Sequence, residues 1–244
     1  MTKTAGIVVI GNEVLSGKTQ DTNSYFFCQE LRALGVDVRR MVVVPDEIEL
    51  IGQEVAAAAQ KHDFVFTSGG VGPTHDDVTM AGIAHGFGVR VIHHPVLERR
   101  LRERYGEAIN EARLRMAEVP EGAELVAEGS LYAPVVKFRN VYIFPGIPRI
   151  LQERFRAIRE RFRGSPFFLK AIYVKEGEGL IASILNHLLE SFPQLLLGSY
   201  PVLDHPDYKV KVTLESKDPD YLEQALQKLS SALPKGSIYR IEGN

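Results

Sequence analysis

Short apolar runs and helically spaced apolar positions follow one another through the first part of the chain. Continuous or alternating apolar runs predict strands over residues 6–10, 36–44 and 63–67. Between them, apolar residues recur at helical spacing over residues 22–34 and 46–59. Strands alternating with helices at this pace predict βαβ units and a mostly parallel sheet.

The middle of the chain continues this α/β pattern. The spacing predicts a helix over residues 77–85 and one long charged helix over residues 95–116. Residues 135–138 and 141–144 read as a hairpin turning at Arg139 and Asn140, and a further helix is expected over residues 147–162.

A different order follows the stretch Gly164-Ser165-Pro166, which reads as a linker. We expect strand, helix, two strands, helix and strand, over residues 168–174, 179–189, 195–200, 208–215, 219–233 and 237–241. This βαββαβ order is that of the ferredoxin-like fold. The sequence therefore predicts an α/β domain over residues 1–164 and a small α+β domain over residues 165–244.

The composition is that of an ordinary globular protein and excludes some classes of protein. The 244 residues are 45% hydrophobic and 25% charged with a formal net charge of -2, so nothing favours nucleic acid as a partner. The single cysteine excludes an internal disulfide framework. No apolar run is long enough to span a bilayer, which leaves a cytoplasmic location by elimination.

A glycine-rich stretch, SGGVGPT, begins where the strand over residues 63–67 stops. Ligands of open parallel sheets bind beyond the carboxyl ends of the strands. Glycines let the backbone approach a ligand, and consecutive N–H groups can point inward at an anion. We therefore expect a phosphate-binding turn, called the glycine turn below, made of Ser68, Gly69, Gly70, Gly72, Pro73 and Thr74.

Acidic residues follow the glycine turn directly. Asp76 and Asp77 stand where the next helix should begin, and either could simply cap that helix. Two carboxylates beside a phosphate would repel it unless a cation intervenes, and oxygen ligands favour Mg²⁺ or Mn²⁺. Both aspartates are thus candidate metal ligands and catalytic residues. His75 could bind phosphate, act as an acid or be ordinary loop polarity.

Other strand ends should reach the same edge of the sheet. Glu13 follows the first strand and Asp46 follows the second, where Asp46 could also be a helix cap. Pro145, Gly146 and Pro148 follow the strand over residues 141–144 and would close the third side. These residues join the candidate site.

The stretch GNEVLSGKT suggests a P-loop but departs from it. The P-loop pattern G-x-x-x-x-G-K-[ST] has one residue fewer between its glycines. We therefore do not expect a P-loop nucleotidase, although Lys18 could contact phosphate as a simple charge.

Several segments resemble the MoaB/Mog-like molybdopterin-binding fold, specifically the CinA N-terminal-domain family and the related domain of FAD synthases. GNEVLSGKTQDTNSYF resembles the opening segment of that family, and its Asn23 is thereby a candidate ligand-binding residue. SGGVGPTHDDVT matches the family's GG-x-GPT-x-DD-x-T motif. NEARLRMAEVPEGAEL and VYIFPGIPRILQERF match two further segments. The resemblance covers about residues 5–160 well, and the part beyond resembles the small domain that follows in the same proteins.

The resemblance implies activities that the residues alone do not. CinA-type domains and their FAD-synthase counterpart hydrolyse the pyrophosphate of ADP-ribose or FAD with a divalent metal (Mg²⁺, Mn²⁺ or Co²⁺) and potassium. The Mog branch adenylylates molybdopterin, with aspartates that correspond to Asp46 and Asp77. No deamidase or FAD-forming domain is visible, so neither activity is expected of this chain, and related proteins form dimers or trimers.

Three functions therefore stay open at this point. The first is a metal-dependent pyrophosphatase that releases AMP from FAD or ADP-ribose, with catalytic Asp77, Asp46 and Asp76. The second is a molybdopterin-binding or adenylylating protein, and the third is a nucleotide-binding module without catalysis.

Overall fold

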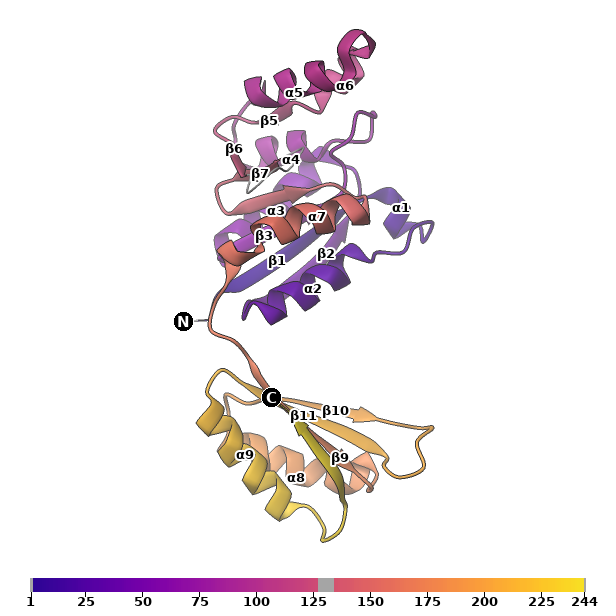
Figure 1. The fold of residues 1–244 in the computed structure, drawn as a ribbon, viewed down its shortest axis with the longest axis vertical. Helices are drawn as coiled ribbons and strands as arrows, with labels where there is room; N and C mark the ends of the chain where they lie inside the picture. The colour runs from indigo at the N-terminus through magenta and orange to yellow at the C-terminus, as the bar shows by residue number, and fades with distance from the viewer. Residues whose placement is uncertain (1, 127–133, 244) are drawn as a thin grey trace. The chain divides into compact units, whose positions relative to one another are not determined.

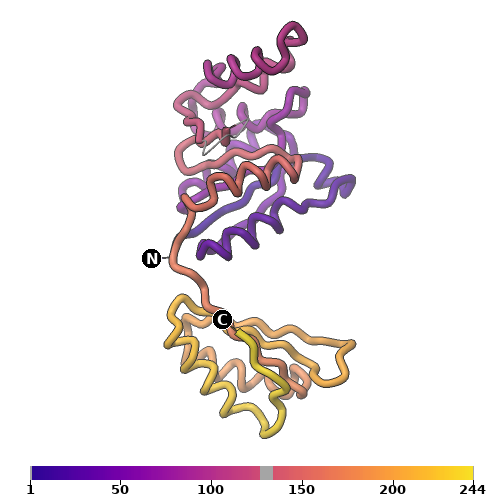
Figure 2. The backbone as a smooth tube through the Cα atoms, viewed as in Figure 1, coloured from indigo at the N-terminus to yellow at the C-terminus, as the bar shows by residue number. Residues whose placement is uncertain are grey.

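The computed structural model describes residues 2–126 and 134–243, which form two compact units that divide between Gly164 and Ser165. Figure 1 shows the elements of each unit, and Figure 2 follows the backbone through both. In the described part of the chain, every helix is too short or too polar to cross a membrane.

The first unit is built on a six-stranded sheet in the order β2-β1-β3-β8-β7-β6. Its four leading strands, which are all parallel, are β2 (Asp37–Val44), β1 (Thr4–Ile10), β3 (Phe64–Ser68) and β8 (Val141–Phe144). Beyond them, β7 (Val135–Phe138) pairs antiparallel with β8, and β6 (Glu124–Val126) pairs antiparallel with β7. The mostly parallel sheet and the hairpin at Arg139 and Asn140 were predicted correctly.

Helices cover both faces of this sheet and give a three-layer α/β/α unit (Figure 1). One face packs against α2 (Asn23–Ala33) and α7 (Pro148–Ile158), through buried phenylalanines that include Phe27 and Phe155. The other face packs against α3 (Ile48–Lys61) and α4 (Thr79–Gly86), through Ile51 and Ile83. Burial on both faces explains why the central strands are continuous apolar runs. A short 3₁₀ helix, η2 (Arg159–Phe162), follows α7.

The single helix expected over residues 95–116 is wrong. The structure has α5 (Pro95–Tyr105), a 3₁₀ turn η1 (Gly106–Ala108) and α6 (Glu111–Arg115). Gly106 ends α5 with a φ of 51°, a conformation that favours glycine. Asn110 then starts α6, since its side chain accepts a hydrogen bond of 2.9 Å from the Arg113 N–H.

Four short elements were not predicted from the sequence, one of which is the edge strand β6. Strands β4 (Val91–His93) and β5 (Glu118–Pro120) pair as a separate antiparallel ribbon beside α5 and α6. A one-turn helix, α1 (Asn12–Leu15), follows β1.

The second unit has the predicted βαββαβ order. Its elements are β9 (Phe168–Val174), α8 (Glu178–Ser191), β10 (Leu196–Pro201), β11 (Val210–Ser216), α9 (Pro219–Ala232) and β12 (Ile238–Gly243). The strands form an antiparallel sheet in the order β10-β11-β9-β12, the ferredoxin-like arrangement. Both helices pack on the sheet through a separate apolar core that includes Ile181, Leu226 and Leu229.

Candidate functional site

The carboxyl ends of the parallel strands lie in register. Ile10 pairs with Val44, and Ser68 pairs with both Val9 and Phe144. The backbone continues this contact one step past the strands, because the Gly11 N–H donates to Val44 O (3.1 Å) and the Gly69 N–H donates to Phe144 O (3.2 Å). The loops after β1, β2, β3 and β8 therefore meet at one edge.

Two glycines of the glycine turn are required by the fold itself. Gly69 and Gly70 have φ values of 108° and 62°. A Cβ on Gly69 would lie 2.0 Å from Ile10 O, and one on Gly70 would lie 2.4 Å from Thr79 Oγ1. The Thr79 hydroxyl is buried and donates to Gly69 O (2.8 Å). The turn is thus held in shape by its own chain.

Consecutive backbone donors remain without partners in this turn. The Gly69 and Thr74 N–H groups are used internally, but those of Gly70, Val71 and Gly72 have no hydrogen-bond partner among residues 2–126 and 134–243. Backbone N–H groups seek acceptors almost without exception. Three neighbouring free donors at a strand end are what an anion site requires.

The carboxylate of Asp77 shapes the second half of the turn. Its Oδ2 accepts hydrogen bonds from the Thr74 N–H (2.8 Å) and from the Thr74 hydroxyl (2.5 Å). Helix α4 begins only at Thr79, with Val78 at its N-cap and no side-chain cap. The expectation that Asp76 and Asp77 stand at the start of the helix is therefore wrong, and neither residue caps it.

Asp76 and His75 point outward. The Asp76 side chain is 58% exposed and that of His75 is 97% exposed, with Nδ1 of His75 lying 3.9 Å from Asp76 Oδ1. The nearby Thr74 hydroxyl and the N–H of Asp76 itself lower the pKa of the Asp76 carboxyl. Asp76 is consequently ionised at neutral pH. Pro73 is exposed beside it.

Asp46 also has a role other than capping. Its Oδ2 accepts a hydrogen bond of 2.8 Å from the Asn12 N–H, which ties the loop after β2 to the loop after β1. Glu47 is at the N-cap of α3, without a side-chain bond. Glu13 on α1 and Lys18 in the following turn are both exposed, and neither lines the cavity beside the glycine turn.

Asn23 connects the third side of the site. Its amide donates to Ser68 Oγ (2.9 Å) and to Gly146 O (2.7 Å), while its own Oδ1 is buried without a partner in the described part of the chain. A Cβ on Gly146 would lie 3.4 Å from Gly69 Cα, so the turn holding Pro145, Gly146 and Pro148 packs on the glycine turn. Gly146 and Pro148 are exposed there.

A cavity of about 150 Å³ lies beside the glycine turn and is lined by Gly70, Val71, Gly72 and Asp77. The same cavity is lined by Arg115 at the end of α6, Met116 just after it and Glu118 at the start of β5, and none of these residues was predicted. Arg115 is exposed and has neither a hydrogen bond nor an ion pair with any described residue. In the sequence, these residues belong to the segment NEARLRMAEVPEGAEL, which resembles a family segment. That segment has no chemical motif that would have marked them as site residues.

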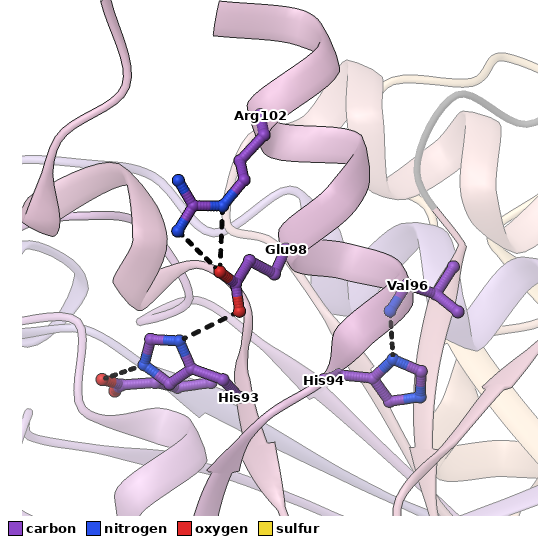
Figure 3. Close-up of polar contacts among 6 residues, drawn as sticks. His93, His94, Val96, Glu98 and Arg102 are labelled. Carbon is purple, nitrogen blue, oxygen red and sulfur yellow. Dashed lines mark hydrogen bonds and ion pairs between the residues drawn. The ribbon is translucent and has the colours of Figure 1, made fainter. Parts of the chain in front are cut away.

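A polar network stands behind Glu118. His93 lies between two carboxylates, with Nε2 3.6 Å from Glu118 Oε1 and Nδ1 3.8 Å from Glu98 Oε2. Figure 3 shows His93 facing Glu98, whose Oε1 in turn accepts from Arg102 Nη2 at 2.7 Å. His94 faces away and its Nδ1 accepts from the Val96 N–H at the start of α5.

The described residues contain no group of three or more His, Cys, Asp or Glu side chains placed to hold a metal ion. A site made wholly by the protein is thus not formed by these residues. Asp76 and Asp77 beside the glycine turn are two carboxylates, the number that Mg²⁺ commonly binds when substrate phosphates complete its ligands. These two carboxylates fit a metal that is completed by the ligand.

Known proteins support this reading of the fold. A probable molybdopterin binding domain matches residues 6–163, and the FAD synthase middle domain matches residues 166–242. A probable FAD synthase of Caenorhabditis elegans is 34% identical over 266 residues, covering 97% of this chain and 51% of that protein. The chain thus spans about half the length of this relative.

Two further relatives have the size of this chain or of its first unit. A protein of Archaeoglobus fulgidus is 33% identical over 228 residues, which is 93% of this chain and 96% of the relative. The crystal structure of the protein CinA, with unknown function, from Thermoplasma acidophilum is 31% identical with a TM-score of 0.61, covering 66% of this chain and 100% of that one. The chain therefore belongs to the family of probable molybdopterin binding domains, in the form followed by an FAD synthase middle domain.

Proposed function

We propose that the chain is a metal-dependent nucleotide pyrophosphatase that cleaves the diphosphate of FAD or ADP-ribose and releases AMP. The observation that carries this proposal is the cavity that joins the free N–H groups of Gly70, Val71 and Gly72 to Asp77 and Arg115. The backbone N–H donors and the Arg115 guanidinium can bind the two negative charges of a diphosphate. An ionised carboxylate can bind a cation that is itself bound to the diphosphate.

Each side chain has a distinct part in the proposed reaction. The glycine turn binds the diphosphate oxygens and orients the phosphorus for attack. Arg115 offsets the charge that develops on the bridging and terminal oxygens as the P–O bond breaks. Water enters, and the products from FAD are FMN and AMP. Asp46 positions Asn12 at the edge of the site through their hydrogen bond.

Asp76 and Asp77 would hold the divalent metal. When bound, a divalent cation screens the phosphates and lowers the pKa of a coordinated water. Asp76 is exposed and ionised, so its carboxylate is available to the cation without rearrangement. Asp77 keeps Oδ1 for this purpose while Oδ2 is bonded to Thr74.

The test compares two Asp→Asn variants. Purified protein is incubated with FAD or ADP-ribose, Mg²⁺, Mn²⁺ or Co²⁺, and K⁺, and AMP is measured by chromatography. Asp77→Asn keeps the size of the side chain and one oxygen but removes the charge, and should lower AMP release by about 100-fold or more. Asp204→Asn makes the same change at an exposed residue of the second unit and should leave the rate unchanged. Absence of AMP from the unaltered protein with every metal would refute the proposal.

The match to a probable molybdopterin binding domain favours one rival, transfer of an adenylyl group from ATP to a pterin. The same anion site would then hold the phosphates of ATP, and the acceptor would be a pterin phosphate rather than water. Formation of an adenylylated pterin, with no AMP released from FAD or ADP-ribose, would favour this rival. Retention of FAD without any turnover would instead indicate a binding module.

A further inference from the structure

A second cavity adjoins the one beside the glycine turn. It also has a volume of about 150 Å³, and it shares Val71, Met80 and Met116 with the first cavity. Both lie in the first unit. The second space is therefore the immediate neighbour of the glycine-turn cavity, within reach of the rest of a ligand whose phosphates occupy that turn.

The walls of the second cavity are mostly apolar. Leu97, Leu101 and Tyr105 come from α5, while Val136 and Ile143 come from β7 and β8. Such a lining suits a planar ring system, which gains from burial of its faces and from contact with an aromatic side chain. It does not suit a phosphate, because an anion pays a large desolvation cost among apolar groups.

The charged groups around this cavity are all hydrogen-bond donors. Arg100, Arg104 and Arg154 line it, and no carboxylate is among the described lining residues. Arg154 projects from α7 and is half-buried, and burial lowers the pKa of its guanidinium. Within the described residues it has no hydrogen bond or ion pair. A desolvated guanidinium without an acceptor is costly, and an acceptor on a ligand would remove that cost.

We propose that this cavity binds the ring end of the dinucleotide and selects a ring whose edge carries carbonyl acceptors over a ring whose edge carries an amino donor. A guanidinium has only donors, so it pairs with ring carbonyls and is opposed by an exocyclic amino group. Arg154 provides this selection, and the apolar wall around Leu101 and Tyr105 holds the ring faces. The inference rests on the proposed function, since the diphosphate brings the ring to this position.

The test uses ring compounds without phosphate, so that the glycine turn contributes nothing. Binding of riboflavin is followed by its fluorescence, and binding of adenosine by calorimetry, with no metal and no turnover. The unaltered protein should bind riboflavin more tightly than adenosine. Arg154→Met keeps the length of the apolar stem and should weaken riboflavin binding about tenfold or more, the loss expected for charge-assisted hydrogen bonds.

Two other variants complete the design. Arg156 is an exposed residue of the same helix, and its guanidinium stacks over Phe26. Arg156→Met makes the same change there and should leave riboflavin binding unchanged. Leu101→Trp fills the cavity from α5 and should abolish riboflavin binding without removing a charge, which keeps the inference testable if Arg154→Met fails to fold.

Each result has a separate meaning for the two proposals. Tighter or equal binding of adenosine, or equal riboflavin binding by Arg154→Met and the unaltered protein, would overturn the assignment of the cavity. Riboflavin binding in a protein that releases no AMP would overturn the hydrolase but retain the ring site. AMP release by a protein that does not bind riboflavin would retain the hydrolase and overturn the ring site.

Discussion

The glycine turn owes its shape to close contacts made by single residues. Gly70 and Gly88 have nearly the same φ, 62° and 65°, but very different surroundings. A Cβ on Gly70 would meet Thr79 Oγ1 at 2.4 Å, whereas a Cβ on Gly88 would have nothing within 4 Å. The pair therefore separates the cost of the backbone angle from the cost of the contact.

Alanine at these two positions should destabilise the first unit by different amounts. Gly88→Ala should cost about 1 kcal/mol, the cost of a left-handed conformation for a residue with a Cβ. Gly70→Ala should cost a further 1–3 kcal/mol or so, because it displaces the buried Thr79 hydroxyl from Gly69 O. Urea denaturation followed by circular dichroism measures both. Equal losses in the two variants would show that the contact with Thr79 does not matter.

His62 makes the stability of the first unit depend on pH. Both ring nitrogens are buried without a hydrogen-bond partner among the described residues, and burial, followed by the charge of Lys61, lowers the pKa of the ring. The unfolded chain, with an imidazole pKa near 6.5, therefore binds the proton first as the pH falls. The stability that neutral His62 contributes is therefore fully present above about pH 6.5. It is lost as the pH falls toward the lower pKa that His62 has in the folded protein.

The measurement is the urea midpoint at neutral pH and at about one unit below the unfolded pKa. His62→Leu cannot titrate and should lose less stability over this range than the unaltered protein. His75→Leu removes a ring that is 97% exposed and should behave like the unaltered protein. An unchanged pH dependence in His62→Leu would contradict the burial argument.

At the scale of elements, the hairpin of β7 and β8 is fastened to the end of α3 by one side chain. Asn140 donates to Ala59 O and to His62 O, both at 2.9 Å. The last carbonyls of a helix have no partners within the helix, so these two bonds serve as its C-terminal cap.

Asn140→Ala should lower stability by about 1–2 kcal/mol and speed amide exchange in the last turn of α3, because two carbonyls lose their donor. Gln53→Ala removes an exposed amide from the same helix and is the control. Thermal unfolding and hydrogen exchange measure the two effects. Exchange that stays as slow in the last turn of α3 would mean that water or another group replaces Asn140.

The sequence predicted the central elements well because their burial on both faces requires continuous runs of apolar residues. The apolar run after Gly6 in β1 is buried on both faces, and a continuous run of this length between turn residues is typical of a buried strand. The break after Tyr105 could not be read in this way, because α5 and α6 have no buried residues and their charged pattern continues across Gly106. Strand β4 contains the apolar residues Val91 and Ile92, but it is only three residues long and has no buried residue, so it shows no period that would predict a strand.

The site was predictable to the extent that it depends on strand ends. Topology brings the loops of Gly11, Asp46, Gly69 and Gly146 together, and each of these followed from an expected strand. Capping of α3 by Asp46 was a sound local alternative, but the residue bonds Asn12 in a neighbouring loop instead. Arg115 could not be placed, since its position depends on the break that precedes α6.

At the scale of the whole molecule, each of the two units has a core of its own. The first unit has an apolar cluster on each face of its sheet, and the second unit has one beneath its two helices. Contacts divide the chain between Gly164 and Ser165. We propose that these units are independent domains.

Separate expression tests this proposal. Residues 1–164 and 165–244 should each be soluble and unfold cooperatively, because each unit has an apolar core of its own. If the cavities described above are sufficient, residues 1–164 should also release AMP from FAD at a rate close to that of the full chain. A fragment 1–164 that folds but is inactive would assign part of the site to the second unit.

The internal bonding of the glycine turn has one further consequence. Because the Gly69 and Thr79 N–H groups are already bonded in the free protein, to Phe144 O and Gly70 O, ligand capture needs no ordering of this loop. Association should then be limited by diffusion and electrostatic steering rather than by a conformational step. In the presence of Mg²⁺, which offsets the carboxylates, the observed binding rate should rise linearly with ligand concentration and fall with added salt. The turn is, in that sense, a rigid receptor, and the charge of Arg115 beside it favours fast association of an anionic ligand.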